Sequence, residues 1–206
     1  MPENRVLMLL EAGDWGEDQK RIEGLKEWKQ YPQLLEAYRT LNQEALYKSR
    51  VHGSGHIHRV LLFAALIGWQ EGLGEEDLRQ YFQMASYHDV GRTFDGFDIY
   101  HGARSALRLE ALTGQTGERL KEMQAAVSAH SRPDRDMETL VRSYEPLDLD
   151  HALEMTRLLK DADNLDRVRL GDLKVRFLRH DSARDLAEFA RRLFRLDQEM
   201  KKRLLR

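Results

Sequence analysis

The sequence predicts an all-α fold, organised as a single-domain helical bundle. Apolar residues recur with the 3.6-residue period of amphipathic helices along most of the chain, and no segment shows the alternation of Val, Ile and Thr that is typical of strands. The chain has 206 residues, of which 41% are hydrophobic, enough for one domain with a sizeable core. Because repeats and low-complexity segments are absent, we expect residues 1–206 to form one domain.

Glycines and acidic residues indicate where the helices begin and end. Residues 72–74 include two glycines that end an apolar helix, and the three acidic residues at 75–77 suit the first turn of the next helix. Residues 131–150 are polar and contain two prolines, which predicts a long loop with room for one short helix. The predicted helices span residues 4–12, 18–29, 32–48, 55–71, 75–89, 100–113, 116–130, 150–166 and 182–204.

Composition excludes several classes of function. A net charge of -2 gives no basic field for nucleic acid, and the absence of cysteine rules out disulfides, thiolate metal sites and a cysteine nucleophile. The longest apolar run, residues 60–69, is too short to span a membrane. The first residues turn acidic early and lack the basic start of a signal peptide. We therefore expect a cytoplasmic protein without a membrane partner.

The stretch ASYHDVGRTFDG, residues 85–96, places two metal-type ligands at the end of a predicted helix. His88 and Asp89 continue the apolar face of this helix, ten and eleven residues after Leu78. The pair is therefore expected to point into the core, where an aspartate is costly unless a cation or a full set of hydrogen bonds compensates it.

Four more predicted helices begin or end an apolar face with a residue of the same kind. Helical bundles build metal sites from inward side chains on facing helices, so the joint pattern indicates a shared site. Imidazole and carboxylate ligands without sulfur suit Fe, Mn, Zn, Co or Ni. Two ions bridged by Asp89 would use all the ligands. The additional residues are His56, His101, His130 and Asp163.

Three other histidines, His58, His151 and His180, are expected to lie outside this site. His180-Asp181 is a second His-Asp pair, but it precedes a helix that Asp181 or Ser182 would cap, so we expect it to be structural. His58 lies on another face of its helix than the inward positions, and we expect it at the surface together with His151. The C-terminal helix has one apolar stripe and a basic face, which predicts a packed helix or, alternatively, a homodimer or anionic-partner surface.

Three segments of the chain resemble the HD-domain superfamily of metal-dependent phosphohydrolases. "HIHRVLLFAALI" is similar to the helix that carries the first histidine of that family, and "ASYHDVGR" is similar to its His-Asp signature. "KDADNLDRVRLGD" is similar to the segment that supplies the last aspartate. The resemblance covers roughly residues 50–172, and the flanking helices carry no such signature.

The resemblance implies a dinuclear metal site. His56 takes the place of the first ligand, and His88 and Asp89 take the central pair. His101 and His130 resemble the extra histidines of two-metal members. The last ligand is Asp163, three residues before Asp166 in the family's D-x-x-D spacing, with Asp161 as the competing choice. Fe or Mn is expected first, and Zn, Co, Ni or Mg also fit.

The implied activity is hydrolysis of a phosphoester or phosphoanhydride bond, in a nucleotide or small phosphorylated metabolite, by metal-activated water. Asp89 and Arg92 are the expected catalytic residues, with Gly91 allowing the backbone to turn between them. Arg92 would clamp phosphate or, alternatively, pair with Asp95 or Asp98. The expected substrate-binding residues are His52, Arg59, Arg92, Asp98 and Arg167. The alternative for His52 is a solvated loop position, and the alternative for Arg59 and Arg167 is pairing with helix carboxylates.

Two other functions share this ligand order. One is an HD-type mixed-valent diiron oxygenase, in which the same order of histidines and aspartates would bind the iron ions. The other is a non-catalytic HD protein that binds a nucleotide. Iron content and oxygen uptake, weighed against phosphate release, discriminate between these functions.

Overall fold

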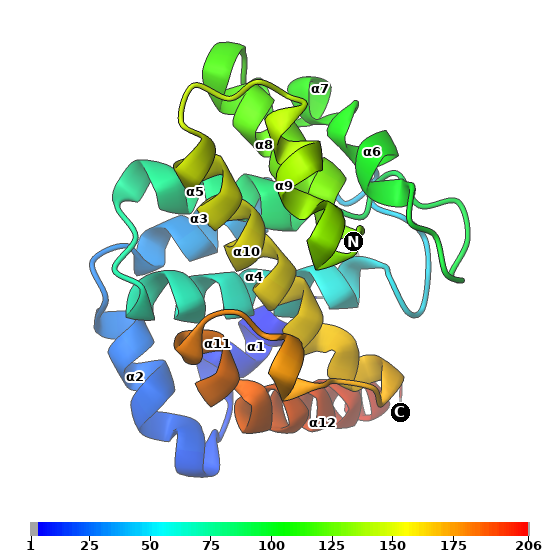
Figure 1. The fold of residues 1–206 in the computed structure, drawn as a ribbon. Helices are drawn as coiled ribbons and strands as arrows, with labels where there is room; N and C mark the ends of the chain where they lie inside the picture. Colours follow the sequence, from blue (N-terminus) through cyan, green and yellow to red (C-terminus); the bar gives the residue numbers. More distant parts are fainter. Residues whose placement is uncertain (1–3, 206) are drawn as a thin grey trace.

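Two long helices, α4 (Ser54–Gln70) and α10 (Leu149–Leu165), form the centre of the fold, and the other helices pack around them (Figure 1). The computed structural model describes residues 4–205, and over that range it contains helices and no strands. The all-α prediction is thereby confirmed. The remaining helices are α1 (Arg5–Ala12), α2 (Gln19–Glu27), α3 (Tyr31–Thr40), α5 (Glu75–Tyr87), α6 (His101–Ala106), α7 (Leu109–Thr113), α8 (Gly117–His130), α9 (Asp134–Arg142), α11 (Asp181–Asp185) and α12 (Ala187–Leu204).

The helices gather in two groups on either side of this centre. On one side, α8 packs against α10, and α6, α7 and α9 pack against α8. On the other side, α1 and α12 contact each other (Figure 1). Three short 3-10 segments, η1 (Gly16–Asp18), η2 (Asp166–Leu170) and η3 (Val175–Phe177), link the helices. Helices α5, α8 and α10 all contact one another, and residues at their C-terminal ends lie close to the first turn of α4.

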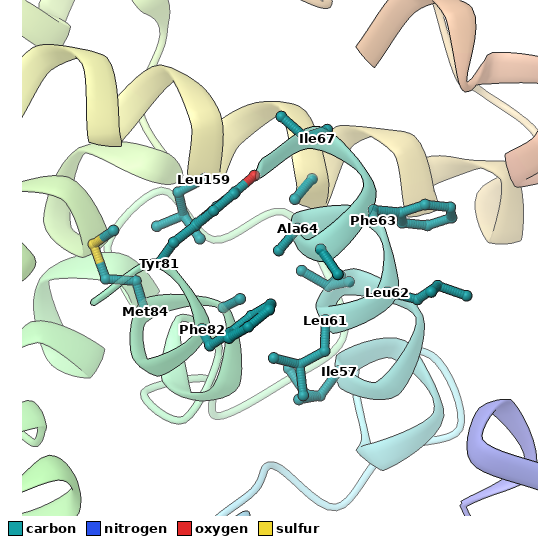
Figure 2. Packing of buried hydrophobic residues seen from close by; sticks show 14 of the residues in the cluster. Ile57, Leu61, Leu62, Phe63, Ala64, Ile67, Tyr81, Phe82, Met84 and Leu159 are labelled. Carbon is teal, nitrogen blue, oxygen red and sulfur yellow. The ribbon is translucent and has the colours of Figure 1, made fainter. Parts of the chain in front are cut away.

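Helix α4 is buried on nearly all of its faces, since 13 of its 17 residues are buried. Its apolar run packs against Tyr81 and Phe82 of α5 and Leu159 of α10 (Figure 2). The expectation that His58 lies at the surface is therefore wrong: the residue is 2% exposed, and its ring meets Tyr38 edge-on at 5.9 Å. A helix surrounded by neighbours has no solvent face for a histidine.

Several helices are shorter than their periodicity predicts. The helix predicted over 32–48 ends at Thr40, whose hydroxyl donates to the Glu36 carbonyl, and turns and irregular chain follow up to α4. The helix predicted over 100–113 breaks after α6, and the Arg108 side chain at the break donates a hydrogen bond to the Val90 carbonyl. The helix predicted over 182–204 is likewise divided into α11 and α12. The polar segment 131–150 does contain one short helix, α9.

The C-terminal helix packs against the core, as one of its two interpretations predicts. Phe189 and Leu193 of α12 are fully buried, and Leu196 and Met200 are partly buried against the same cluster. In the described part of the chain, no helix combines the length and the apolar character needed to cross a membrane.

Candidate metal centre

Five helices bring six side chains to one place. Helix α4 carries one ligand in its first turn, and the turn after α5 carries two. The first residue of α6, the last residue of α8 and the last turn of α10 carry one each. The six are His56, His88, Asp89, His101, His130 and Asp163, all of which the sequence predicts as ligands.

Asp89 lies between two groups of imidazole nitrogens, with one carboxylate oxygen toward each. Its Oδ1 is 3.0 Å from His101 Nε2 and 3.8 Å from His130 Nε2. Its Oδ2 is 3.5 Å from His56 Nε2 and 3.9 Å from His88 Nε2. The two oxygens of Asp89 therefore lie nearest to different pairs of histidines.

The first group consists of His56, His88 and Asp163. The two Nε2 atoms are 3.1 Å apart, and Asp163 Oδ1 lies 3.3 Å from that of His56 and 3.7 Å from that of His88. In the second group, the Nε2 atoms of His101 and His130 are 3.0 Å apart. The ligand atoms of His56, His88 and Asp163 lie within 4.8 Å of one another, as do those of His88, Asp89 and His130, so each set could hold a metal ion.

The other ring nitrogen of each histidine already has a partner. His56 Nδ1 donates to Asp166 Oδ2 at 2.7 Å, and His88 Nδ1 donates to the Ala85 carbonyl at 2.9 Å. The Nδ1 atoms of His101 and His130 donate to backbone carbonyls of Asp98 and Val127. A proton on Nδ1 leaves the lone pair on Nε2, which is the tautomer of a metal-binding histidine.

These residues fit a divalent cation. Two Nε2 lone pairs that face each other at about 3 Å repel unless a positive charge lies between them. Asp89 Oδ2 is a buried carboxylate oxygen with no hydrogen-bond partner among the described residues, a costly state that a cation relieves.

The electrostatics favour the metal-binding forms of Asp89 and His130, whereas they favour the charged form of His88. Although burial raises the pKa of Asp89, His88 and the hydrogen bonds from His101 and His130 hold it well below its usual value. Burial lowers the pKa of His130 to about 4. Burial also disfavours the charged form of His88, but the charge of Asp89 and the hydrogen bond with Asp163 raise its pKa. Among the clustered residues, a positively charged imidazole supplies charge that a bound metal ion would otherwise supply.

Asp163, and not Asp161, faces the histidines. Asp161 is fully buried on another side of α10, where its Oδ2 accepts from the backbone N–H of Arg179 at 2.9 Å and from His180 Nδ1 at 2.7 Å. His180 in turn contacts Glu154 Oε1 at 2.8 Å, so the second His-Asp pair lies apart from the six residues. Its expected capping role is wrong, since His180 occupies the N-cap position of α11 and no side chain caps this helix.

Arg92 contacts the bridging carboxylate directly. Its Nε donates to Asp89 Oδ1 at 2.9 Å, and neither Asp95 nor Asp98 is its partner. The chain does turn at Gly91, but φ there is not positive, so the turn itself does not require a glycine. A Cβ at this position would lie 2.4 Å from the Ser105 backbone nitrogen, so the glycine permits close packing against α6.

His52 lies beside the site. It is 4% exposed, its Nδ1 is 3.0 Å from Asp95 Oδ1, and its ring meets the His56 ring at 6.1 Å. Burial lowers the pKa of His52 to about 4 despite the Asp95 hydrogen bond, so the ring is neutral near pH 7.

The other three residues expected to bind substrate have protein partners instead. Arg59 is 4% exposed and donates to both Asp166 oxygens and to Asp197. The Asp98 carboxylate pairs with Arg104. Arg167 pairs with Asp172 at the surface. These contacts occupy the groups that a substrate would need, and the structure does not favour a binding role for Arg59, Asp98 or Arg167.

Sequence reasoning missed the role of Asp166. Its carboxylate is fully buried and connects the first histidine ligand to Arg59, whose Nε lies 2.6 Å from Asp166 Oδ1. Although burial opposes it, the charge of Arg59 lowers the pKa of Asp166 to about 2. The three-residue spacing from Asp163 was the visible signal, but the direction of the side chain depends on the 3-10 turn that follows α10.

Comparison with known proteins gives one match. The profile of the HD domain family matches residues 53–168, more than half of the chain, and this range contains all six clustered residues. Comparisons with curated proteins and with solved structures gave no significant match. With its helical fold and its His/Asp cluster, the chain belongs to the HD domain family.

Proposed function

We propose that this protein is a two-metal phosphohydrolase, which cleaves a phosphoester or phosphoanhydride bond in a nucleotide or small phosphorylated metabolite. The position of Asp89 carries the proposal, because its two oxygens face two separate groups of imidazole ligands. Family membership supports metal-dependent hydrolysis as the general chemistry.

Each group of ligands would hold one ion. His56, His88 and Asp163 would bind the first, His101 and His130 the second, and Asp89 both. Divalent ions at such ligands lower the pKa of water and neutralise charge on phosphoryl oxygens. Iron and manganese suit this all-nitrogen-and-oxygen donor set, as do zinc, cobalt and nickel.

Arg92 would serve the reaction in two ways. Its Nε–H fixes the orientation of the Asp89 carboxylate. Its Nη2 has no hydrogen bond to any described residue, which leaves a donor for a phosphoryl oxygen of the substrate. The ring of His52, packed against His56, is a second candidate contact.

Metal analysis paired with a phosphate-release screen tests the proposal. Protein purified without chelator should contain about two ions per chain and release phosphate from a nucleotide or phosphoester with Mn or Fe(II). His88→Ala and Asp89→Ala should lose metal and activity together. His151→Ala is the matched control, because the His151 ring is partly exposed and pairs with Asp77 and Glu122, away from the clustered ligands.

Two outcomes would contradict the proposal. Metal content that survives both His88→Ala and Asp89→Ala would place the metal elsewhere. Oxygen consumption by the iron-loaded protein without phosphate release would identify an oxygenase on the same ligands.

A further inference from the structure

The geometry points to Arg169 as a substrate-binding residue, which holds a phosphoryl group beside the metal site. This inference rests on the proposed function, since it names the residue that receives the anionic part of that substrate. Arg169 lies in η2, directly after the helix that carries Asp163.

Two arginines of η2 differ sharply in their surroundings. The Arg167 side chain is 42% exposed and paired with Asp172. The Arg169 side chain is 6% exposed, and its Nε and Nη1 are buried without a hydrogen-bond partner among the described residues. A buried guanidinium with unused N–H groups is costly, because those donors have lost water and gained nothing in return.

The single carboxylate near Arg169 does not satisfy it. Asp166 Oδ2 lies 3.5 Å from Arg169 Nη1, within ion-pair range, but it already accepts from His56 Nδ1 at 2.7 Å and Arg59 Nη2 at 2.9 Å. Asp197 in turn is shared by Arg59 and Arg5. This network therefore holds three guanidinium groups and two carboxylates, an excess of one positive charge.

Arg169 lies next to the first ligand group. Its Nη1 and the Nδ1 of His56 both contact the same oxygen, Asp166 Oδ2. It is also near His52, whose pKa is lowered mainly by burial and further by the charges of Arg92 and Arg169. The charges of Arg92 and Arg169 therefore both reach His52.

The chemistry of the free donors selects the ligand. Nε and Nη2 of a guanidinium form a planar fork that matches two oxygens of a phosphoryl group, and in Arg169 neither atom makes a hydrogen bond to a described residue. A doubly charged oxyanion would supply both the acceptors and the negative charge that this network lacks. An arginine serves here because it keeps its charge when buried.

Calorimetric titration of the metal-loaded protein with orthophosphate tests the inference. Arg169→Gln should weaken phosphate binding about tenfold or more, since a hydrogen bond to a charged group is lost. Arg169→Lys should recover part of the affinity, and Arg167→Gln, two residues away with the same charge change, should bind as the wild type does. Metal content and circular dichroism of each variant should match the wild type.

The inference fails if orthophosphate does not bind the wild type, or binds Arg169→Gln equally well. It also fails if Arg169→Gln loses metal, because Arg169 would then act through Asp166 on His56. Hydrolysis with an unchanged KM in Arg169→Gln would overturn this inference and leave the proposed function intact. Phosphate affinity that depends on Arg169, in a protein that hydrolyses no ester, would support this inference and contradict the proposed function.

Discussion

At the scale of single residues, each histidine ligand is held by its second ring nitrogen. His56 is the strongest case, because its Nδ1 meets a carboxylate, whereas His88, His101 and His130 meet backbone carbonyls. A carboxylate partner makes an imidazole a stronger base and a better metal ligand. Asp166 therefore influences metal affinity without contacting the metal position.

Asp166→Asn should lower metal affinity roughly 10- to 100-fold, because the Nδ1 partner of His56 loses its charge. Chelator competition followed by metal analysis would measure the change. Asp161→Asn is the control, since Asp161 is equally buried and paired but faces away from the ligands. It should reduce stability and keep metal affinity close to that of the wild type. Equal affinities in the two variants would contradict the role of Asp166.

The six clustered residues could be predicted because each one ends an apolar helical face, a feature that periodicity reveals. The residues behind them could not. Asp166 and Arg169 lie in a 3-10 turn, where side-chain direction does not follow from a helical period. Arg167 looked equivalent to Arg169 in the sequence, and only the packing of η2 distinguishes the exposed residue from the buried one.

At the scale of elements, the position of α6 depends on two glycines. A Cβ on Gly91 would lie 2.4 Å from the Ser105 nitrogen, and a Cβ on Gly102 would lie 2.5 Å from the Val127 carbonyl oxygen. Both approaches are too short for a side chain, so α6 fits between the His-Asp turn and α8 only because both residues lack one. His101 begins this helix.

Gly102→Ala should displace α6 and with it His101. We expect a loss of about 1–3 kcal/mol in the free energy of unfolding, as for an overpacked core, and a metal content closer to one ion per chain than two. Urea unfolding and metal analysis would measure both. Gly74→Ala is the control, because a Cβ there would meet nothing within 4 Å. Full metal occupancy in Gly102→Ala would show that α6 tolerates the shift.

The segment between η3 and α11 is fastened to α10 by a charged histidine. The hydrogen bond to Asp161 raises the pKa of His180 to about 9 from 6.5, against the effect of burial. Because the pKa is higher in the folded state, the stabilisation is complete below pH 6.5 and is lost as the pH rises through about 9.

His180→Gln should therefore destabilise the protein more at about pH 6 than at about pH 9.5. Urea unfolding of both proteins at the two pH values, with a chelator present to remove metal binding from the comparison, gives the difference. A difference that is the same at both pH values would show that the His180 charge does not stabilise this segment.

The helical pattern predicted the existence of the long helices and missed where some of them end. The ends of α4, α5, α8 and α10 fall within two residues of the expected positions, because glycines or strong periodicity mark them. The helix predicted over 32–48 ended early at Thr40, and the residues that follow form turns in which the Asn42 N–H donates to the Tyr87 hydroxyl of α5. Burial of His58 was also missed, because the pattern of one helix does not show how many neighbours surround it.

At the scale of the whole molecule, one buried ion-pair network joins both ends of the chain to the site. Asp197 of α12 accepts from Arg5 of α1 at 2.7 Å and from Arg59 of α4 at 2.6 Å, and Arg59 continues to Asp166. The two residues of each of these ion pairs lie more than 100 positions apart in the sequence, so local patterns could not reveal their contact. The fold class followed from periodicity alone, whereas this connection required the packing.

Asp197→Asn should cost about 3 kcal/mol or more in the free energy of unfolding, because two arginines lose their shared counter-charge and one of them is fully buried. Urea denaturation would measure it. Asp181→Asn removes an exposed pair with Arg184 and should change stability by less than about 1 kcal/mol. Similar losses in the two variants would mean that the Asp197 network contributes no more than a surface pair.

The same network indicates how much of the chain is needed for a functional metal centre. The HD domain match covers residues 53–168 and includes every clustered ligand, but Arg5, Arg169 and Asp197 all lie outside it. A fragment trimmed to the matched residues would keep its ligands. It would lose Asp197, one of the two carboxylates that pair with Arg59, together with the helices that cover α4. Truncation of the termini is therefore expected to disable the metal centre by removing residues that support the ligands, although every residue that faces the metal would remain.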